Sequence, residues 1–302
     1  MARRKPSSVF GLLNVHKPPG PTSHDVVQTV RRGTRERRIG HAGTLDPMAE
    51  GVLVLALGQA TRLIEYLMAS QKRYRAEVTL GVVTDSYDAE GDVLEQHPLP
   101  PGLTHTQIDA TLDRFRGEIQ QVPPVYSALK IDGKSAHARV RAGETVTLEP
   151  RAVTISELAL LDYAPPILQL DVRCSPGTYI RSLAHDLGQE LGCGAMLSSL
   201  VRTESGQFTL DEAISLDTLR AAFEAGSWRD KLLSADMALA TSPRVDLTED
   251  EWHRIQNGAP IARISRDEAL ARGYDPHGRF ACVLTGQQDD PSWRPRKVFP
   301  PT

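Results

Sequence analysis

The sequence has few of the residues that cross-link or anchor a protein. It contains three cysteines, Cys174, Cys193 and Cys282, and no pair has Cys-x-x-Cys spacing. An odd, scattered set argues against a disulfide framework and a zinc cage, and is typical of a reduced cytoplasmic protein. The longest purely apolar run, Val52–Leu57, is too short to cross a bilayer. The N-terminal MARRKPSS is charged and no apolar segment follows it, so we expect no signal peptide.

Two further absences concern chemistry and charge. The nine histidines form neither an HExxH nor an HxH pattern, so we predict no metal site. The formal net charge of −3 does not indicate a nucleic-acid-binding protein. Residues 1–40, however, hold nine basic and two acidic residues, and 31–38 read RRGTRERR. This stretch is either a solvated helix end or a phosphate-binding surface. The second interpretation is compatible with a negative net charge, because salt screens distant charges and a phosphate group interacts mainly with the charges near it.

The remaining composition is that of a globular protein. The chain has 302 residues, of which 40% are hydrophobic and 24% charged, enough for two domains. Alternating and helical patterns predict short strands mixed with single helices, and neither a P-loop nor a G-x-G-x-x-G motif is present. We therefore predict an α+β fold with a largely antiparallel sheet. One strand is predicted to begin at residue 11, and others to span 52–57, 72–84, 151–161 and 167–173. One helix is predicted to begin at Thr22 or Ser23, and others to span 60–70, 105–115 and 175–192.

The chain is predicted to divide near its C-terminus. Residues 84–103 are expected to form a polar loop, and 117–150 to form strand fragments and an exposed excursion. A linker is predicted at 232–243, which gives one domain over 1–235 and a small β-rich domain over 242–302.

One loop carries a carboxylate in an unusual setting. IGHAGTLDP, residues 39–47, runs into the apolar strand at 52–57. Asp before Pro is common in turns, and Pro47 favours extended backbone at Asp46, so this residue alone is typical of turn chemistry. GHAG also lacks the second histidine of the HxGH signature of nucleotidyltransferases. If Asp46 is functional, it acts as a nucleophile or general base, with a buried arginine that lowers its pKa and binds it bidentately.

Two other clusters have both structural and functional interpretations. KRYR places Tyr74 among cations at the start of a strand, as a core tyrosine or as a platform for an unstacked base. GTYIR places Tyr179 and Arg181 at a helix start, where Arg181 can point into a cleft. Neither cluster is specific when taken alone.

The clusters together resemble a known family. In order along the chain stand HKPPGPTSHDVV, GHAGTLDPMAEGVLVLALGQATRL, KRYRAEVTLG, VPPVYSALKIDGKSAHARVRAGE and CSPGTYIRSLAHDLGQELG. This series resembles the bacterial tRNA pseudouridine-55 synthases, the TruB family, closely over residues 9 to about 220 and loosely beyond. The resemblance implies a pseudouridine-synthase fold and isomerisation of one T-loop uridine, without metal or cofactor. The base must be flipped out of the folded T-loop for this reaction.

The resemblance also implies roles for individual residues. Asp46 matches the catalytic aspartate, Tyr74 the tyrosine stacked on the target uracil, and Arg181 the arginine paired with the aspartate. His41 is implied to contact the T-loop, and Tyr179 and Leu200 to line the uracil pocket. Lys17 and Pro18 match a motif packed behind the catalytic loop, so support is expected of them.

The accessory parts follow from the same resemblance. Residues from about 242 resemble a short RNA-binding PUA domain, and 117–150 correspond to the thumb insertion of the family. The thumb here reads KSAHARVRAG and lacks a tyrosine found in familiar versions, although Lys134, Arg139 and Arg141 remain as phosphate-binding candidates.

The expected partner is the T-arm of tRNA. We expect neither a membrane nor an obligate protein partner, and a monomer in the cytoplasm. Two alternatives stay open, a guide-RNA-dependent synthase of a ribonucleoprotein and a tRNA-binding folding chaperone.

Overall fold

The computed structural model describes residues 9–127, 130–131, 134–135, 139, 146–262, 268–287 and 290–299. The elements up to residue 121 are β1 (Phe10–Lys17), α1 (Ser23–Thr34), β2 (Ile39–Ala42), β3 (Glu50–Gly58), η1 (Gln59–Leu63), α2 (Ile64–Met68), β4 (Lys72–Leu80), β5 (Val82–Thr84), β6 (Val93–Gln96), α3 (His105–Leu112), η2 (Asp113–Phe115) and β7 (Gly117–Gln121). Those that follow, up to 239, are β8 (Lys130–Ile131), β9 (Lys134–Ser135), β10 (Arg151–Ala164), β11 (Ile167–Cys174), α5 (Ile180–Glu190), β12 (Ala195–Ser205), β13 (Phe208–Thr209), β14 (Ile214–Ser215), α6 (Leu216–Glu224), η3 (Trp228–Lys231) and η4 (Ala235–Leu239). The C-terminal part contains β15 (Arg244–Asp246), α7 (Glu249–Gln256), β16 (Ile261–Ala262), β17 (Leu270–Tyr274), β18 (Phe280–Thr285) and β19 (Ser292–Val298).

A ten-stranded sheet forms the centre of the larger part. Its main path runs β14-β1-β3-β12-β4-β11-β10-β7, with β2 paired to β3 and β13 to β12. The pairs β1–β14 and β3–β12 are parallel and the other pairs of this sheet are antiparallel. The predicted α+β class with a mostly antiparallel sheet is confirmed.

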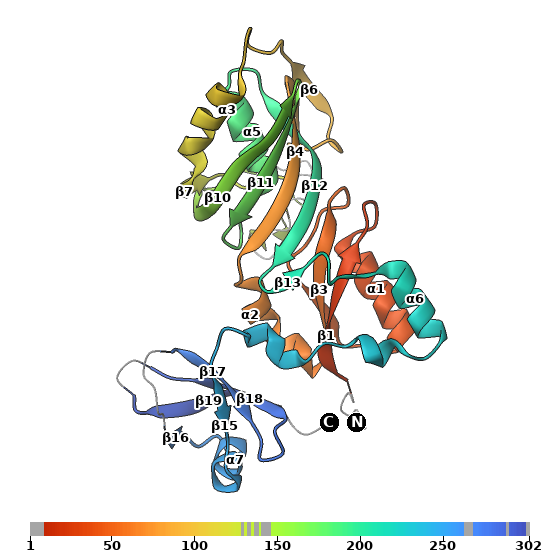
Figure 1. The fold of residues 1–302 in the computed structure, drawn as a ribbon, viewed down its shortest axis with the longest axis vertical. Coiled ribbons are helices and arrows are strands. Elements are labelled where there is room, and N and C mark those ends of the chain that lie inside the picture. Colours follow the sequence, from red (N-terminus) through yellow and green to blue (C-terminus); the bar gives the residue numbers. More distant parts are fainter. Residues whose placement is uncertain are drawn as a thin grey trace.

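The apolar run in β3 is buried on both faces of the sheet. Leu53 and Leu55 belong to the core cluster that includes residues of α1, α3, α5 and α6. Val52 and Val54 point to the opposite face, where they pack in a second cluster with η1, η4 and the C-terminal part. Because successive strand side chains alternate between faces, a strand covered on both sides has to be apolar throughout. The helices α1 and α6 cover one end of the sheet, and α3 and α5 cover the other (Figure 1).

The structure refines several predicted elements. Thr22 is the N-cap of α1, with a capping box to Asp25, so the earlier of the two candidate caps is correct. The segment 84–103, predicted as a loop, contains β6, which pairs with β5. The predicted helix at 60–70 begins as the 3-10 helix η1, which ends at Leu63, and continues as five residues of α2. Parts of the predicted thumb, 128–129 and most of 132–145, lie outside the described residues.

A second, five-stranded sheet forms the C-terminal part, in the order β15-β17-β18-β19-β16, with α7 beside it (Figure 1). This confirms the predicted small β-rich domain. The predicted linker packs against the larger part: Leu233 bridges to Leu12 of β1, and Ala235 and Leu239 are buried. Arg62 donates to the carbonyl of Val298 at 2.7 Å, which fixes β19 to η1. The exact division between the two domains stays a prediction.

Candidate active site

A pocket of about 270 Å³ is lined in part by Arg202 of β12, at the point where β12 pairs with β3. These two strands pair at only two positions, Val201 with Glu50 and Arg202 with Gly51. The pocket walls come from the loop after β2, from β4 and β12, and from the segment that enters α5. Five of the predicted residues line it together: Asp46, Tyr74, Tyr179, Arg181 and Leu200.

The end of the Asp46 loop is held by a buried lysine. Lys17, at the end of β1, is fully buried. Its Nζ donates to the carbonyls of Pro18, Pro47 and Ala49 at 3.0, 3.1 and 2.6 Å. Burial lowers the pKa of Lys17 to about 8, although the nearby Asp46 carboxylate acts in the opposite direction. Lys17 and Pro18 thus lie behind the loop, in the place where support was expected.

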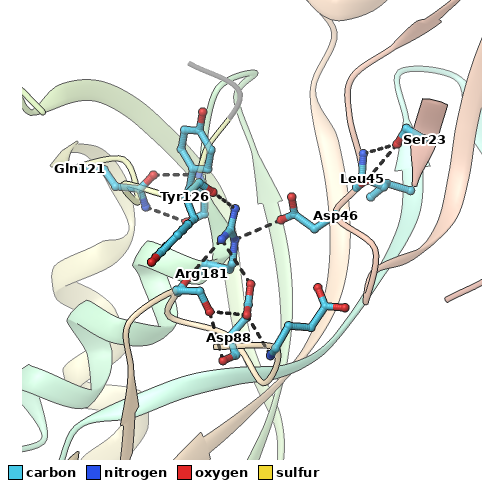
Figure 2. Close-up of polar contacts among 10 residues, drawn as sticks. Ser23, Leu45, Asp46, Asp88, Gln121, Tyr126 and Arg181 are labelled. Atoms are coloured by element: carbon cyan, nitrogen blue, oxygen red, sulfur yellow. Dashed lines mark hydrogen bonds and ion pairs between the residues drawn. The ribbon is translucent and has the colours of Figure 1, made fainter. Parts of the chain in front are cut away.

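The start of the same loop is held by two residues that the sequence analysis did not select. Arg202, 1% exposed, donates from Nη2 to the carbonyl of Gly43 at 3.0 Å and from Nε to that of Val52 at 2.7 Å. The buried Ser23 hydroxyl donates to the carbonyl of Leu45 at 2.9 Å and accepts the Leu45 N–H at 2.8 Å (Figure 2). A serine at the start of a helix is usually a helix cap, so the sequence around Ser23 does not indicate that it also binds Leu45.

Arg181 joins the Asp46 loop to α5. Its Nε lies 3.1 Å from Oδ2 of Asp46, and the Arg181 side chain is 6% exposed against 38% for Asp46 (Figure 2). The guanidinium contacts Asp46 through one nitrogen, so the predicted bidentate pairing is wrong. Its other nitrogens face elsewhere: Nη2 donates to the carbonyl of Tyr126 at 2.9 Å, and Nη1 to that of Ser86 at 3.1 Å.

A second carboxylate, Asp88, takes the remaining face of Arg181. Its Oδ2 lies 3.3 Å from Nη1 of Arg181, and the Asp88 side chain is 5% exposed. Oδ1 of Asp88 accepts the Ser86 hydroxyl at 2.5 Å and the Glu90 N–H at 3.0 Å. Because Asp88 lies in the segment predicted as a loop, no periodicity or motif spacing identified it.

The pKa of Asp46 is raised above its usual value. Burial in the pocket is the largest cause, and the Asp88 carboxylate adds to it. Arg181 and Lys17 act in the opposite direction but do not reverse the shift. The expectation that a buried arginine would lower this pKa is therefore wrong in its net direction.

Two aromatic side chains complete the pocket. Tyr74 on β4 is half-buried, and burial raises its pKa while the cationic Arg202 opposes this shift. Tyr179 is the N-cap of α5. Its N–H donates to Oε1 of Gln121 at 2.8 Å, and its carbonyl accepts Nε2 of Gln121 at 3.0 Å (Figure 2). Gln121 was also missed, since a glutamine in a polar stretch carries no functional signal.

The remaining predicted residues are His41, Lys134, Arg139 and Arg141. His41 on β2 does not line the pocket; burial lowers its pKa, and its Nδ1 has no hydrogen-bond partner in the described part of the chain. Lys134 begins the short strand β9, and Arg139 is half-buried. Arg141 lies outside the described residues.

No three His, Cys, Asp or Glu side chains among the described residues are grouped so that they could hold a metal ion. No helix within the described ranges is long and apolar enough to cross a membrane.

The family models and the curated relatives agree on one family. Residues 31–180 match the TruB family pseudouridylate synthase N-terminal domain, and 181–240 match the tRNA pseudouridylate synthase B C-terminal domain. The tRNA pseudouridine synthase B of Dehalococcoides mccartyi is 45% identical, over 96% of both chains. That of Heliobacterium modesticaldum is 40% identical, over 98% of this chain and 97% of the relative. Among solved structures, a chain of an H/ACA RNP bound to a substrate RNA containing 2'-deoxyuridine is 26% identical with a TM-score of 0.72, over 97% of this chain and 86% of that one.

Proposed function

Because the chain belongs to the TruB family of pseudouridylate synthases, we propose that it isomerises the T-loop uridine at position 55 of tRNA, alone and without guide RNA. The observation that carries this proposal is the pocket in which Asp46, Arg181 and Tyr74 meet from three distant segments. The family and the curated relatives support a tRNA pseudouridine synthase, and the choice of the T-loop uridine is our extension.

In the proposed mechanism the flipped uridine enters the pocket and its uracil stacks on the Tyr74 ring. Stacking of this kind recovers roughly 1–3 kcal/mol per base, against the cost of unstacking the base from the T-loop. Tyr179 and Leu200 border the same space and keep it narrow around the base. His41, on the strand leading to the loop, contacts the T-loop outside the pocket.

The Asp46 carboxylate starts the reaction. It promotes cleavage of the bond between N1 of uracil and C1′ of ribose; the uracil then turns and C5 bonds to C1′. The proton at C5 must leave, and it returns to the freed N1, so the reaction is an isomerisation with no other reactant. Asp46 is the better acceptor of the C5 proton, since its raised pKa makes it a stronger base than an ordinary aspartate. The raised pKa of Tyr74 keeps that residue protonated at neutral pH.

Arg181 fixes the position of this carboxylate. It is buried and bound on three sides by Asp46, Asp88 and backbone carbonyls, so its Nε can point in only one direction. We propose that Asp88 holds the guanidinium in place and that Lys17 and Arg202 hold the loop. A preorganised carboxylate of this kind avoids reorganisation during the reaction.

The second candidate function is guide-RNA-dependent pseudouridylation, which the similarity to the H/ACA RNP chain favours. That similarity is 26% in sequence, against 45% for the D. mccartyi tRNA pseudouridine synthase B. We therefore propose the stand-alone enzyme, acting as a monomer in the cytoplasm. Sizing the active species by light scattering tests the monomer.

The deciding experiment uses purified protein and a T-arm stem–loop with tritium at C5 of its uridines. We expect tritium release without added RNA, and mass mapping that places pseudouridine at position 55 of whole tRNA. Asp46→Asn should abolish release while tRNA binding survives, and Asp250→Asn, at an exposed carboxylate on α7, should behave like the parent. Release that depends on a guide RNA would favour the second candidate. Binding that improves tRNA folding with no release would indicate a chaperone.

A further inference from the structure

Five arginines are gathered at the C-terminal end of α1 and in the turn that follows it. We call Arg31, Arg32, Arg35, Arg37 and Arg38 the arginine patch. Arg31 is half-buried, and Arg32, Arg35, Arg37 and Arg38 are exposed. They lie within eight residues of a chain whose net charge is −3, so the patch is a local concentration of positive charge.

None of these guanidinium groups forms an ion pair with a carboxylate in the described part of the chain. Glu36, the acid within this stretch, accepts the backbone N–H of Arg38 at 2.8 Å. By contrast, Arg220 on the neighbouring helix α6 pairs with Asp217 at 2.7 Å. The helix dipole favours cations in the last turn of α1, which accounts for Arg31 and Arg32. It does not account for the three arginines that follow the helix, whose mutual repulsion a bound anion would relieve.

The patch is held at a fixed distance from the pocket. At its first residue, Ser23, α1 is bonded to Leu45 in the Asp46 loop. The twelve residues of α1 extend roughly 18 Å from Ser23. Near its other end a Cβ on Gly33 would lie 2.1 Å from the Phe223 ring, so α1 packs directly on α6. The helix is therefore fixed at both ends and cannot move the patch toward Asp46.

We propose that the arginine patch binds backbone phosphates of tRNA that lie beyond the T-arm. This inference rests on the proposed function, which places the T-loop in the pocket. Because α1 carries the patch roughly 18 Å away from the Asp46 loop, we infer that the patch faces the outer end of the T-arm and the adjoining tRNA. Guanidinium groups bind phosphate bidentately, and such contacts orient a nucleic acid without reading its sequence.

The test compares two substrates and two sets of variants. Arg31→Gln, Arg32→Gln, Arg35→Gln and Arg37→Gln are combined in one protein, because glutamine keeps helix propensity and removes charge. We expect KM and Kd for whole tRNA to rise at least tenfold, with kcat unchanged. The slope of log Kd against log salt should become shallower by about 0.7–0.9 for each phosphate that the variant no longer neutralises. For the isolated T-arm stem–loop, KM should stay within twofold of the parent value.

Matched single variants control for the removal of an arginine as such. Arg35→Gln should weaken tRNA binding measurably, whereas Arg220→Gln, which removes an ion-paired arginine from α6, should leave it unchanged. Equal Kd values for whole tRNA in the parent and the fourfold variant would overturn the proposal. So would an equal weakening on both substrates, which would place the binding phosphates inside the T-arm. Binding is measured independently of turnover, so an inactive parent protein would refute the proposed function and leave this test intact.

Discussion

Two adjacent hydroxyls at the start of α1 have different structural roles, and this difference can be tested. Thr22 caps the helix: its Oγ1 accepts the N–H of Asp25 at 3.1 Å. Ser23 instead holds the Asp46 loop through the N–H and carbonyl of the buried Leu45. We predict that Thr22→Ala lowers stability alone, and that Ser23→Ala lowers both stability and kcat.

The magnitudes follow from the bonds removed. Loss of an N-cap hydroxyl costs about 1 kcal/mol of folding free energy. Ser23→Ala removes two hydrogen bonds, each worth about 1 kcal/mol, and leaves the N–H and carbonyl of Leu45 without that partner. We therefore expect a destabilisation of about 2–4 kcal/mol, part of it as local displacement of the loop. Because Asp46 follows Leu45, a shift of the loop by a fraction of an ångström should lower kcat at least tenfold.

The assay combines urea unfolding with single-turnover tritium release at saturating enzyme. Ser23→Thr restores the hydroxyl and should recover most of the rate. A kcat for Ser23→Ala within twofold of the parent would refute the role of Ser23 as a loop anchor. Equal reductions of kcat in Thr22→Ala and Ser23→Ala would show that helix stability, and not the bond to Leu45, controls the rate.

Two further predictions concern buried charge. Arg181→Lys should lower kcat at least a hundredfold without unfolding the protein, because one ammonium cannot reach Asp46, Asp88 and the Tyr126 carbonyl together. Single-turnover rates measure the loss, and circular dichroism checks that the fold is kept. Near-normal turnover would contradict this prediction. Burial raises the pKa of Asp186 from 3.8 to about 6. Between pH 4 and pH 6 the folded protein therefore keeps a proton on this carboxyl, whereas the unfolded chain has released it. Stability should then fall as pH rises from 4 to 6 and stay lowered above 6, by less than about 3 kcal/mol because solvent screens this partly exposed carboxyl. Asp186→Asn should raise the melting temperature at pH 8 and not at pH 4, and an equal shift at both pH values would count against this cause.

Much of the fold and part of the site could be predicted from local sequence. The apolar run of β3, the cap of α1 and the alternation in β4 are signals within a few residues, and the structure contains all three elements. Asp46, Tyr74 and Arg181 were found because each lies in a short motif, and the order of these motifs indicated the family. Their meeting at one pocket depends on the pairing of β4 with β12, which no local pattern encodes.

The missed residues share a physical reason. Asp88, Gln121 and Ser23 act through backbone atoms or through a second side chain that is distant in sequence. A polar residue in a turn or at a helix start is common in any protein, so its type predicts nothing about its partner. The pKa of Asp46 was missed for a related reason. Its net direction depends on how much water the folded pocket excludes, and the sequence identifies only the charged partner, Arg181.

The buried cations around the pocket indicate why so costly an arrangement is kept. Lys17 and Lys72 are at most 6% exposed and are held by backbone carbonyls, and Arg202, at 1% exposed, is held in the same way. Burial lowers the pKa of both lysines to about 8, which measures the cost of keeping them charged. The carboxylates of Asp46 and Asp88 are engaged by Arg181, so the remaining positive charge faces the pocket from β4 and β12. A polyanion entering the pocket would compensate this charge, whereas a neutral substrate would not. Lys72 and Arg202, which line the pocket, therefore favour a polyanion such as RNA as its ligand.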